Sequence, residues 1–283
     1  RTVYHRYWFF ASKITSNYFD HLRLDFLFVT GDANGRHRGP LYGQLLYPDA
    51  ILIALGLFVL ALKRPGRLWL LVGLWIAAVL PAALTTATPH ALRTLPTVFV
   101  WLTLVVEGWH ACLAWWKTIA KPKLVQGIGI VALLGVYVFF FFTWWRSYLV
   151  LTPKLYSQDW QYGYENMIEA VQALQHTYPN TATTISRIYG RPAMFWWFYT
   201  QTDPTQVQLA DALAAKDQGE FLSFDALRFT SIVADFKPGT IVALSPSEWD
   251  TIQLVNPAWK LESQSTIYSP SYQPVWLVGF ITE

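Results

Sequence analysis

Residues 124–145 read LVQGIGIVALLGVYVFFFFTWW and contain no charged side chain. A helix needs about 20 apolar residues to cross the roughly 30 Å hydrocarbon layer of a bilayer. Three more apolar stretches precede this one, at residues 45–62, 68–87 and 92–116. Their connections are too short to form the large soluble shell that buried helices of a soluble protein would require. The sequence therefore predicts a membrane α-helical bundle, with about four transmembrane helices.

Basic residues in the connections predict the orientation of these stretches. The first and third connections are the basic ones, with Lys63, Arg64, Arg67, Lys117, Lys121 and Lys123. The second connection, residues 85–93, has only Arg93. Because basic residues gather on the cytoplasmic side, we expect residues 1–44, the second connection and the chain after about residue 146 to lie on the outer face. Trp144 and Tyr148 are typical of the aromatic belt at a membrane boundary.

The chain accordingly falls into three predicted parts. We expect residues 1–45 to form an outer juxtamembrane segment and loop, residues 46–147 to form four transmembrane helices, and residues 148–283 to form an extracytoplasmic α/β domain. The composition, 53% hydrophobic and 14% charged, suits a membrane protein with a soluble part. The net charge of +3 is too small to indicate nucleic acid as a partner.

Two features of the chain indicate its cellular compartment and its place within a longer protein. The single cysteine, Cys112, excludes an intrachain disulfide framework and a cysteine zinc site. An outward-facing domain without cystines indicates the plasma membrane of a prokaryote. The chain begins with Arg1 rather than Met. We therefore expect it to be the C-terminal part of a longer protein that has further crossings.

The first outer loop contains GDANGRHRGP at residues 31–40. Asn34-Gly35 predicts a tight turn with positive φ. Arg36, His37 and Arg38 then precede a crossing, where arginine offers a planar fork for phosphate oxygens. The loop is interpreted either as an anion site or as a solvated loop whose cations meet lipid headgroups. Asp32 and Asn34 resemble the start of a calcium loop, but the closing glutamate is missing.

The second outer loop reads PAALTTATPHALR, residues 81–93. Proline suits the first turn of a helix, so Pro89 predicts a helix start. His90 and Arg93 are three residues apart and share a helix face. A helix N-terminus with these two side chains favours an anion, although Arg93 alone could snorkel to the headgroups. In the predicted topology both outer loops lie on one side, which suits a phosphate held at the lipid boundary.

Glu107 and His110 lie inside the third stretch. Ionisable residues at such depth are costly and usually face protein or water. We interpret the pair as packing against a partner helix, in the part of the protein that precedes this chain. The Glu-x-x-His spacing also occurs in di-iron bundles, which need partner helices.

Two segments carry a resemblance to known enzymes. They are NYFDHLRLDFLFVTGDANGRHRGPLYGQLLYPDAILIALGL at residues 17–57 and LPAALTTATPHALRTLP at residues 80–96. The loop with Gly-Asp-x-Asn-x-Arg-His and the turn with Pro-His-Ala-Leu-Arg resemble polyprenyl-phosphate-sugar-dependent glycosyltransferases of the GT-C superfamily. These enzymes are related to protein O-mannosyltransferases and to the aminoarabinose transferase. The resemblance covers residues 20–145, and the remainder only in layout.

The resemblance implies sugar transfer from a polyprenyl-phosphate donor in the membrane to an acceptor glycan, lipid or protein on the outer face. It implies that basic residues hold the donor phosphate, and the matching positions are Arg36, His37, His90 and Arg93, with Asp32, Asn34 and Arg38 in support. The catalytic carboxylate of the family lies in an earlier outer loop, so no catalytic residue is assigned here. Some members place a divalent metal near the donor, for which His37 or His90 is a candidate ligand.

Two other functions would use the same features. A transporter or flippase for a lipid-linked sugar needs the phosphate-binding loops, and it is expected to have paired charges or broken helices at mid-membrane. Glu107 and His110 are the residues that hint at this function. The other alternative is a non-catalytic membrane anchor for the C-terminal domain. This function does not explain why the outer loops are basic.

The C-terminal part predicts a small α/β domain. Met167, Ile168, Val171 and Leu174 recur at helical spacing within residues 163–177. Strands are predicted at residues 181–190, 227–234, 240–244, 259–267 and 274–281. Helices are predicted at residues 191–201, at residues 203–213 and from residue 246. The aromatic residues of the first of these helices either fill the core or form platforms for lipid or acceptor, namely Trp196, Trp197 and Tyr199.

Overall fold

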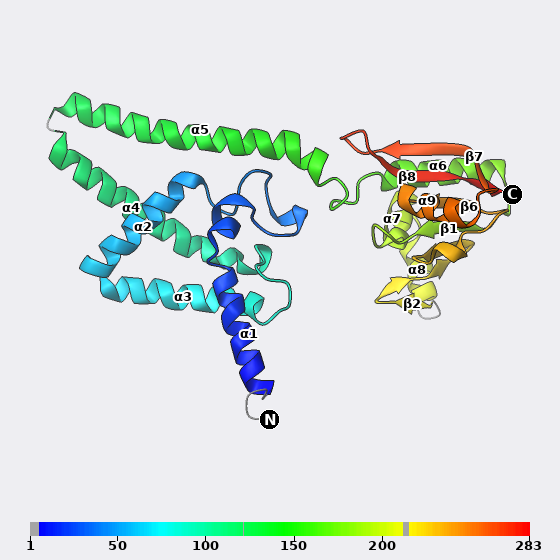
Figure 1. Cartoon of the computed structure of the whole chain (residues 1–283), viewed down its shortest axis with the longest axis horizontal. Helices are drawn as coiled ribbons and strands as arrows, with labels where there is room; N and C mark the ends of the chain where they lie inside the picture. The colour runs from blue at the N-terminus through cyan, green and yellow to red at the C-terminus, as the bar shows by residue number, and fades with distance from the viewer. Residues whose placement is uncertain (1–5, 121, 212–214) are drawn as a thin grey trace. The chain divides into compact units, whose positions relative to one another are not determined.

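The computed structural model describes residues 6–120, 122–211 and 215–283. The chain divides into two compact units, Arg1–Pro153 and Lys154–Glu283, and each is described by itself (Figure 1). The first unit is helical, and the second is a mixed α/β sheet domain. The predicted fold class, a helical part with long apolar helices followed by an α/β domain, is confirmed.

Within the described residues, the α-helices of the first unit are α1 (Arg6–Asp20), α2 (Tyr47–Lys63), α3 (Pro65–Ala83), α4 (Val98–Ile119) and α5 (Lys123–Leu155). Three segments are long and apolar enough to cross a membrane, namely Pro65–Ala83, Leu92–Ile119 and Lys123–Leu155. Helix α2 is also apolar but has 17 residues, at the short end of what a bilayer needs. The crossing by α2 and the orientation of the bundle stay predictions.

Helices α2 and α4 pack closely through two glycines. A Cβ atom on Gly56 would clash with the carbonyl oxygen of Leu104. A Cβ atom on Gly108 would clash with the carbonyl oxygen of Leu52. Small residues let the backbones of membrane helices approach each other, so this contact depends on glycine at both positions.

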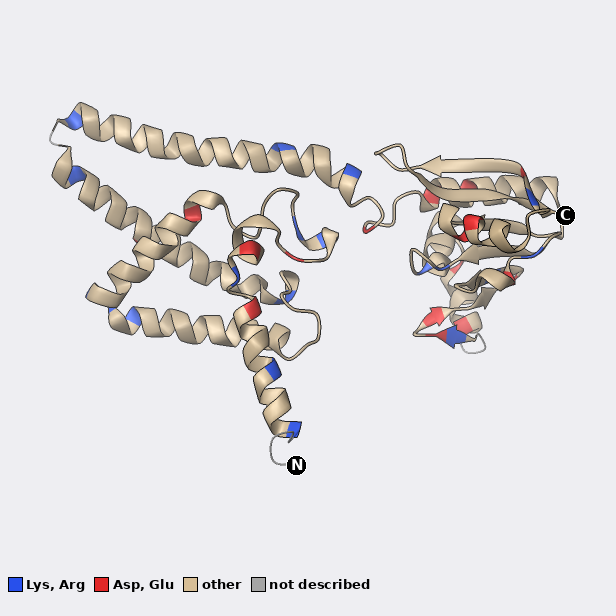
Figure 2. Ribbon diagram, in the orientation of Figure 1, with Lys and Arg blue, Asp and Glu red and all other residues tan. Residues whose placement is uncertain are grey.

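The first unit has two distinct ends. In Figure 1 the α2–α3 turn, the end of α4 and the start of α5 lie at one end, and the loops that precede α2 and α4 lie at the other. Charged residues lie mostly at these ends, while the middle of α3 and of α5 has none (Figure 2). Helix α5 is tied to the rest through Tyr137, whose hydroxyl donates to Asp49 Oδ1 at 2.7 Å, and through Ser147, which donates to the carbonyl of Pro40.

Glu107 has its partners within this unit. Its Oε1 lies 3.5 Å from the guanidinium nitrogens of Arg64 and Arg67, at the α2–α3 turn. These two arginines are partners of Glu107 within the chain, and packing against a helix from a preceding part of the protein stays a prediction. The ion pairs explain how a carboxylate is tolerated midway along α4.

The sheet of the second unit has the strand order β4-β5-β1-β6-β8-β7. Its strands are β4 (Ser223–Phe224), β5 (Leu227–Thr230), β1 (Thr183–Ser186), β6 (Ile241–Leu244), β8 (Pro274–Thr282) and β7 (Lys260–Tyr268). Strand β1 pairs in parallel with β5 and β6, whereas β8 pairs antiparallel with β6 and β7. A separate two-stranded sheet is formed by β2 (Lys216–Asp217) and β3 (Glu220–Phe221).

The alternation of side chains along β6 builds two cores. Ile241 and Ala243 face the cluster under α6 (Tyr164–Thr177) and α7 (Pro192–Tyr199), and Val242 and Leu244 face the cluster under α9 (Pro246–Val255). Successive strand residues point to opposite faces, so a strand buried on both sides reads as a continuous apolar run. The five strands predicted from the sequence are confirmed.

The predicted helices of this unit are confirmed as well. Helix α8 is Pro204–Asp211, and residues 212–213 of the predicted segment lie outside the described residues. Helix α9 begins with Ser245, whose hydroxyl accepts from the Glu248 N–H while the Glu248 carboxylate accepts from the Ser245 N–H. These two hydrogen bonds form a reciprocal cap, which is typical of a serine followed three residues later by a glutamate.

The aromatic helix α7 lies in the core. Trp196 is buried, and the ring of Trp197 meets the rings of Phe221 and Phe224 edge to face, at 4.8 and 5.4 Å. Tyr199 lies at the margin, with 37% of its surface exposed. The interpretation of Trp196 and Trp197 as core residues is therefore confirmed.

Candidate functional site

The loop at residues 31–40 and the loop at residues 85–93 meet at one buried carboxylate, Asp32. Gly31 precedes it with φ +69°, a conformation that glycine adopts without steric penalty, and this turn directs Asp32 inward after the short π-helix Asp25–Val29. Asp32 Oδ2 accepts the N–H of Ala91 in the second loop at 2.7 Å, and Oδ1 accepts the N–H of Asn34 at 2.9 Å. Asp32 thus joins segments that are 59 residues apart.

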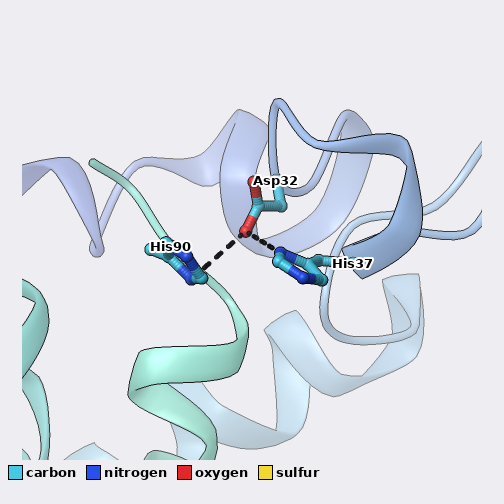
Figure 3. A group of neighbouring side chains, drawn as sticks. All are labelled: Asp32, His37 and His90. Atoms are coloured by element: carbon cyan, nitrogen blue, oxygen red, sulfur yellow. Dashed lines mark hydrogen bonds and ion pairs between the residues drawn. The ribbon is translucent and has the colours of Figure 1, made fainter. Parts of the chain in front are cut away.

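Two imidazoles flank the same carboxylate oxygen (Figure 3). His37 Nδ1 lies 3.3 Å and His90 Nδ1 lies 3.7 Å from Asp32 Oδ2. The two rings lie 5.0 Å apart between centroids and are inclined by 35°. Burial lowers the pKa of His90, against the opposing effect of Asp32, so its neutral form is favoured at neutral pH.

Helix α1 holds the second loop in place. The buried His21 accepts the N–H of His90 on Nε2 at 3.0 Å, so its other nitrogen, Nδ1, donates to the carbonyl of Asn17 at 2.7 Å. Asn17 in turn donates from its amide nitrogen to the carbonyls of Ala83 and Thr85. Burial lowers the pKa of His21, which agrees with a neutral ring whose tautomer is fixed by these two bonds.

A cavity of about 330 Å³ lies beside His37, one of the two imidazoles that flank Asp32. Arg36, His37 and Arg38 line it from the first loop, and Ala91 and Leu92 line it from the second. The opposite wall is formed by Trp144 and Tyr148 of α5, whose rings stack at 5.8 Å. The cavity therefore combines two guanidinium groups with aromatic surface of the kind found at a membrane boundary.

Two further cavities adjoin this one. Gln44, Ala91 and Leu95 also line a second cavity of about 100 Å³. Trp75 and Trp101 of that second cavity also line an apolar groove of about 300 Å³, against α3 and α4. Each cavity therefore shares wall residues with the next.

The structure brings most of the predicted site residues together. Asp32, His37 and His90 form one cluster, and Arg36 and Arg38 line the adjoining cavity. Arg93 is directed elsewhere, because its guanidinium donates to Thr85 Oγ1 at 2.8 Å. Arg93 is not among the residues that line the cavity, and its role in binding the phosphate stays a prediction.

Two local expectations were wrong. Asn34-Gly35 does not form a positive-φ turn, because the Asn34 side chain instead accepts the N–H of Arg36 and starts the short 3-10 helix Gly35–His37. The helix of the second loop begins at Leu92 as a 3-10 helix rather than at Pro89. Pro96 lacks an N–H and would clash with the carbonyl of Leu92 in an α-helix, so α4 begins only at Val98.

His21 and Asn17 were not predicted as part of the site. Asn17 lies in the last turn of α1 and His21 directly follows this helix, so a spacing of four residues places the two side chains close together, in a segment otherwise rich in aromatic residues. That spacing is the signal that could have indicated a buried polar contact. The sequence gives no indication of the partner segment, which lies about 70 residues later at residues 83–90.

Asp32, His37 and His90 are also the group that could hold a metal ion, since their ligand atoms lie within 4.8 Å of one another. Comparison with protein-family models, with curated proteins and with solved structures finds no match for this chain. The resemblance to GT-C glycosyltransferases therefore stays a prediction.

Proposed function

We propose that this chain forms the donor-phosphate site of a membrane glycosyltransferase, which moves a sugar from a polyprenyl phosphate to an acceptor glycan, lipid or protein. The observation that supports this most is the meeting of the two basic loops at Asp32, beside a cavity lined by Arg36, His37 and Arg38. The site would lie on the outer face of a prokaryotic plasma membrane, with the α/β domain on the same side.

The cavity suits the chemistry of a lipid-phosphate leaving group. Negative charge develops on the phosphate as the bond between sugar and oxygen breaks. Arg36 and Arg38 place fixed positive charge at the cavity, and guanidinium groups bind phosphate oxygens in pairs. Cations fixed in place before the reaction stabilise such charge more strongly where water is excluded.

A nearby apolar groove supports a lipid rather than a soluble phosphate as ligand. A polyprenyl chain attached to a phosphate at Arg36 needs apolar surface nearby, and the groove bordered by Trp75 and Trp101 offers such a surface. A free sugar phosphate would make no use of that groove. The same groove would suit a flippase, so the sugar-transfer assay distinguishes the two functions.

Replacement of Arg36 by glutamine is expected to weaken the binding of polyprenyl phosphate by about 10- to 100-fold. Hydrogen bonds to charged groups contribute about 1.5–3 kcal/mol, and about 1.4 kcal/mol corresponds to a factor of ten. Binding is measured with the full chain in lipid nanodiscs, with polyprenyl phosphate and with the uncharged polyprenol. The uncharged alcohol is expected to bind wild type and variant equally.

Arg146→Gln is the matched control, because Arg146 is an exposed arginine of α5 that does not line the cavity. Its affinity for polyprenyl phosphate should equal that of the wild type. Equal losses in the Arg36 and Arg146 variants would mean that general surface charge attracts the lipid, and would end the assignment. Lipid binding without sugar transfer by the full-length protein would favour the flippase.

A further inference from the structure

A groove lies between α4 and α5, at the end of the first unit where these two helices join, opposite the loops that precede α2 and α4 (Figure 1). Its volume is about 370 Å³, and its walls come from both helices. The lining residues carry no charge and include Cys112, Leu113 and Trp116 of α4 and Gly129, Leu133 and Val136 of α5. Such walls favour a hydrocarbon chain over a polar ligand, because a polar group there would lack a hydrogen-bond partner.

Gly129 brings α5 close to Trp116 of α4. A Cβ atom on Gly129 would clash with the indole ring of Trp116, so glycine lets this ring pack against the helix, and the groove stays open beside the contact. Trp115 and Trp116 lie close to the end of α4 at Ile119. Tryptophan is enriched where a helix leaves the hydrocarbon layer, so this end of the groove should reach the membrane boundary.

Two exposed lysines border this end of the groove. Lys117 directly follows Trp116, and it lies four residues after Leu113 and therefore on the same face of α4. Lys123 is the first residue of α5, whose N-terminal N–H groups add partial positive charge.

The charge at this end of the unit is positive (Figure 2). No acidic residue occurs between Glu107 and Asp159 in the sequence, and the carboxylate of Glu107 already pairs with Arg64 and Arg67. Neither α4 nor α5 therefore supplies an acidic side chain close to the two lysines. Their charge suits an anion from outside the chain.

We propose that the groove and the two lysines bind one anionic phospholipid, with an acyl chain between α4 and α5 and the phosphate beside Lys117 and Lys123. Basic sites between transmembrane helices at the cytoplasmic boundary are typical of anionic headgroups, and the basic connections predict this end to be cytoplasmic. An apolar helix would also fill the groove, but it would make no use of the two lysines. Lipid binding here needs only that α4 and α5 span the membrane, so it is independent of sugar transfer.

Cys112 is the single cysteine of the chain and lines the groove, so a label on its thiol reports on the occupant. A bimane fluorophore on Cys112 is measured with the full chain in phosphatidylcholine vesicles that contain increasing fractions of brominated phosphatidylglycerol or brominated phosphatidylcholine. Bromine quenches the fluorophore only at contact. Half-maximal quenching should need about 10- to 30-fold less phosphatidylglycerol, since each lysine favours an anionic lipid about fivefold. Lys117→Gln and Lys123→Gln should each reduce this preference about fivefold.

Lys63→Gln is the matched control, because Lys63 is an exposed lysine at the same end of the unit that does not line the groove. It should keep the wild-type preference. A label on Leu134→Cys in a Cys112→Ser background reports on lipid outside the groove, since Leu134 is exposed on α5 and is not a lining residue. Both brominated lipids should quench that label equally.

Equal quenching of the Cys112 label by the two lipids would overturn the site, as would a preference that Lys117→Gln and Lys123→Gln leave unchanged. No quenching by either lipid would also overturn it, because a helix or a second copy of the chain would then cover the groove. Gel filtration shows that each variant is folded before its quenching is interpreted.

Discussion

Replacement of Gly108 by leucine is expected to prevent α2 and α4 from packing as they do in the native bundle. A Cβ atom at this position would clash with the carbonyl oxygen of Leu52, and backbone atoms cannot move aside as a flexible side chain can. Overpacking typically costs about 1–3 kcal/mol and more where the backbone must shift. We expect a loss of folded protein in detergent, or a midpoint of thermal unfolding lowered by many degrees.

Gly135→Leu on α5 separates this clash from the general effect of adding a side chain. A Cβ atom on Gly135 meets nothing within 4 Å, and leucine has the higher helix propensity, so this variant should be as stable as the wild type or more stable. The two variants are compared by fluorescence-detected gel filtration after heating. Equal stability of the two would show that Gly108 does not lie in a close helix contact.

Replacement of Asp32 by alanine is expected to detach the loop at residues 31–40 from the loop at residues 85–93. The change leaves the N–H groups of Asn34 and Ala91 without their acceptor and removes the group on which His37 and His90 converge. An unsatisfied buried donor costs about 1–3 kcal/mol, so the loss of both acceptors should lower the unfolding free energy by about 2–6 kcal/mol. Hydrogen exchange of both loops should rise well above that of the wild type.

Asp25→Ala is the comparison for this variant, because Asp25 is exposed and pairs with the exposed Arg23 in the same segment. Surface ion pairs contribute little, so a small change is expected there. Asp32→Asn should fall between the two, since an amide oxygen still accepts one of the two N–H groups. Loops that exchange at the wild-type rate in Asp32→Ala would refute the role of this carboxylate.

The sequence predicts correctly those elements that are determined by residues close together in the chain. Strand β6 is a continuous apolar run because both of its faces are covered, and the cap of α9 needs only Ser245 and Glu248, three residues apart. The apolar stretches that become α3, α4 and α5 are recognisable because their length and composition suit a bilayer. None of these inferences requires knowledge of a distant partner.

The elements that the sequence does not predict depend on distant partners. Helix α1 is strongly aromatic, and its role follows from bonds to the loop at residues 83–90, which no local pattern encodes. The hydrogen bond from the guanidinium of Arg93 to Thr85 Oγ1 is another contact that no local pattern indicates. Likewise, the carboxylate of Glu107 on α4 forms ion pairs with Arg64 and Arg67 at the α2–α3 turn. Only the packing of the helices reveals this pairing.

The central claim is that the loop at residues 31–40 and the loop at residues 85–93 form one site, and thiol cross-linking tests it most directly. In a Cys112→Ser background, Arg38→Cys and Leu92→Cys place one thiol on each loop, at positions that line the same cavity. A short cross-linker should join them, as detected by mass spectrometry of the linked peptides. Arg38→Cys with Leu62→Cys should stay unlinked, because Leu62 lies about 22 Å further along α2 than Tyr47. Efficient linkage of Arg38 to Leu62, and none to Leu92, would contradict the account.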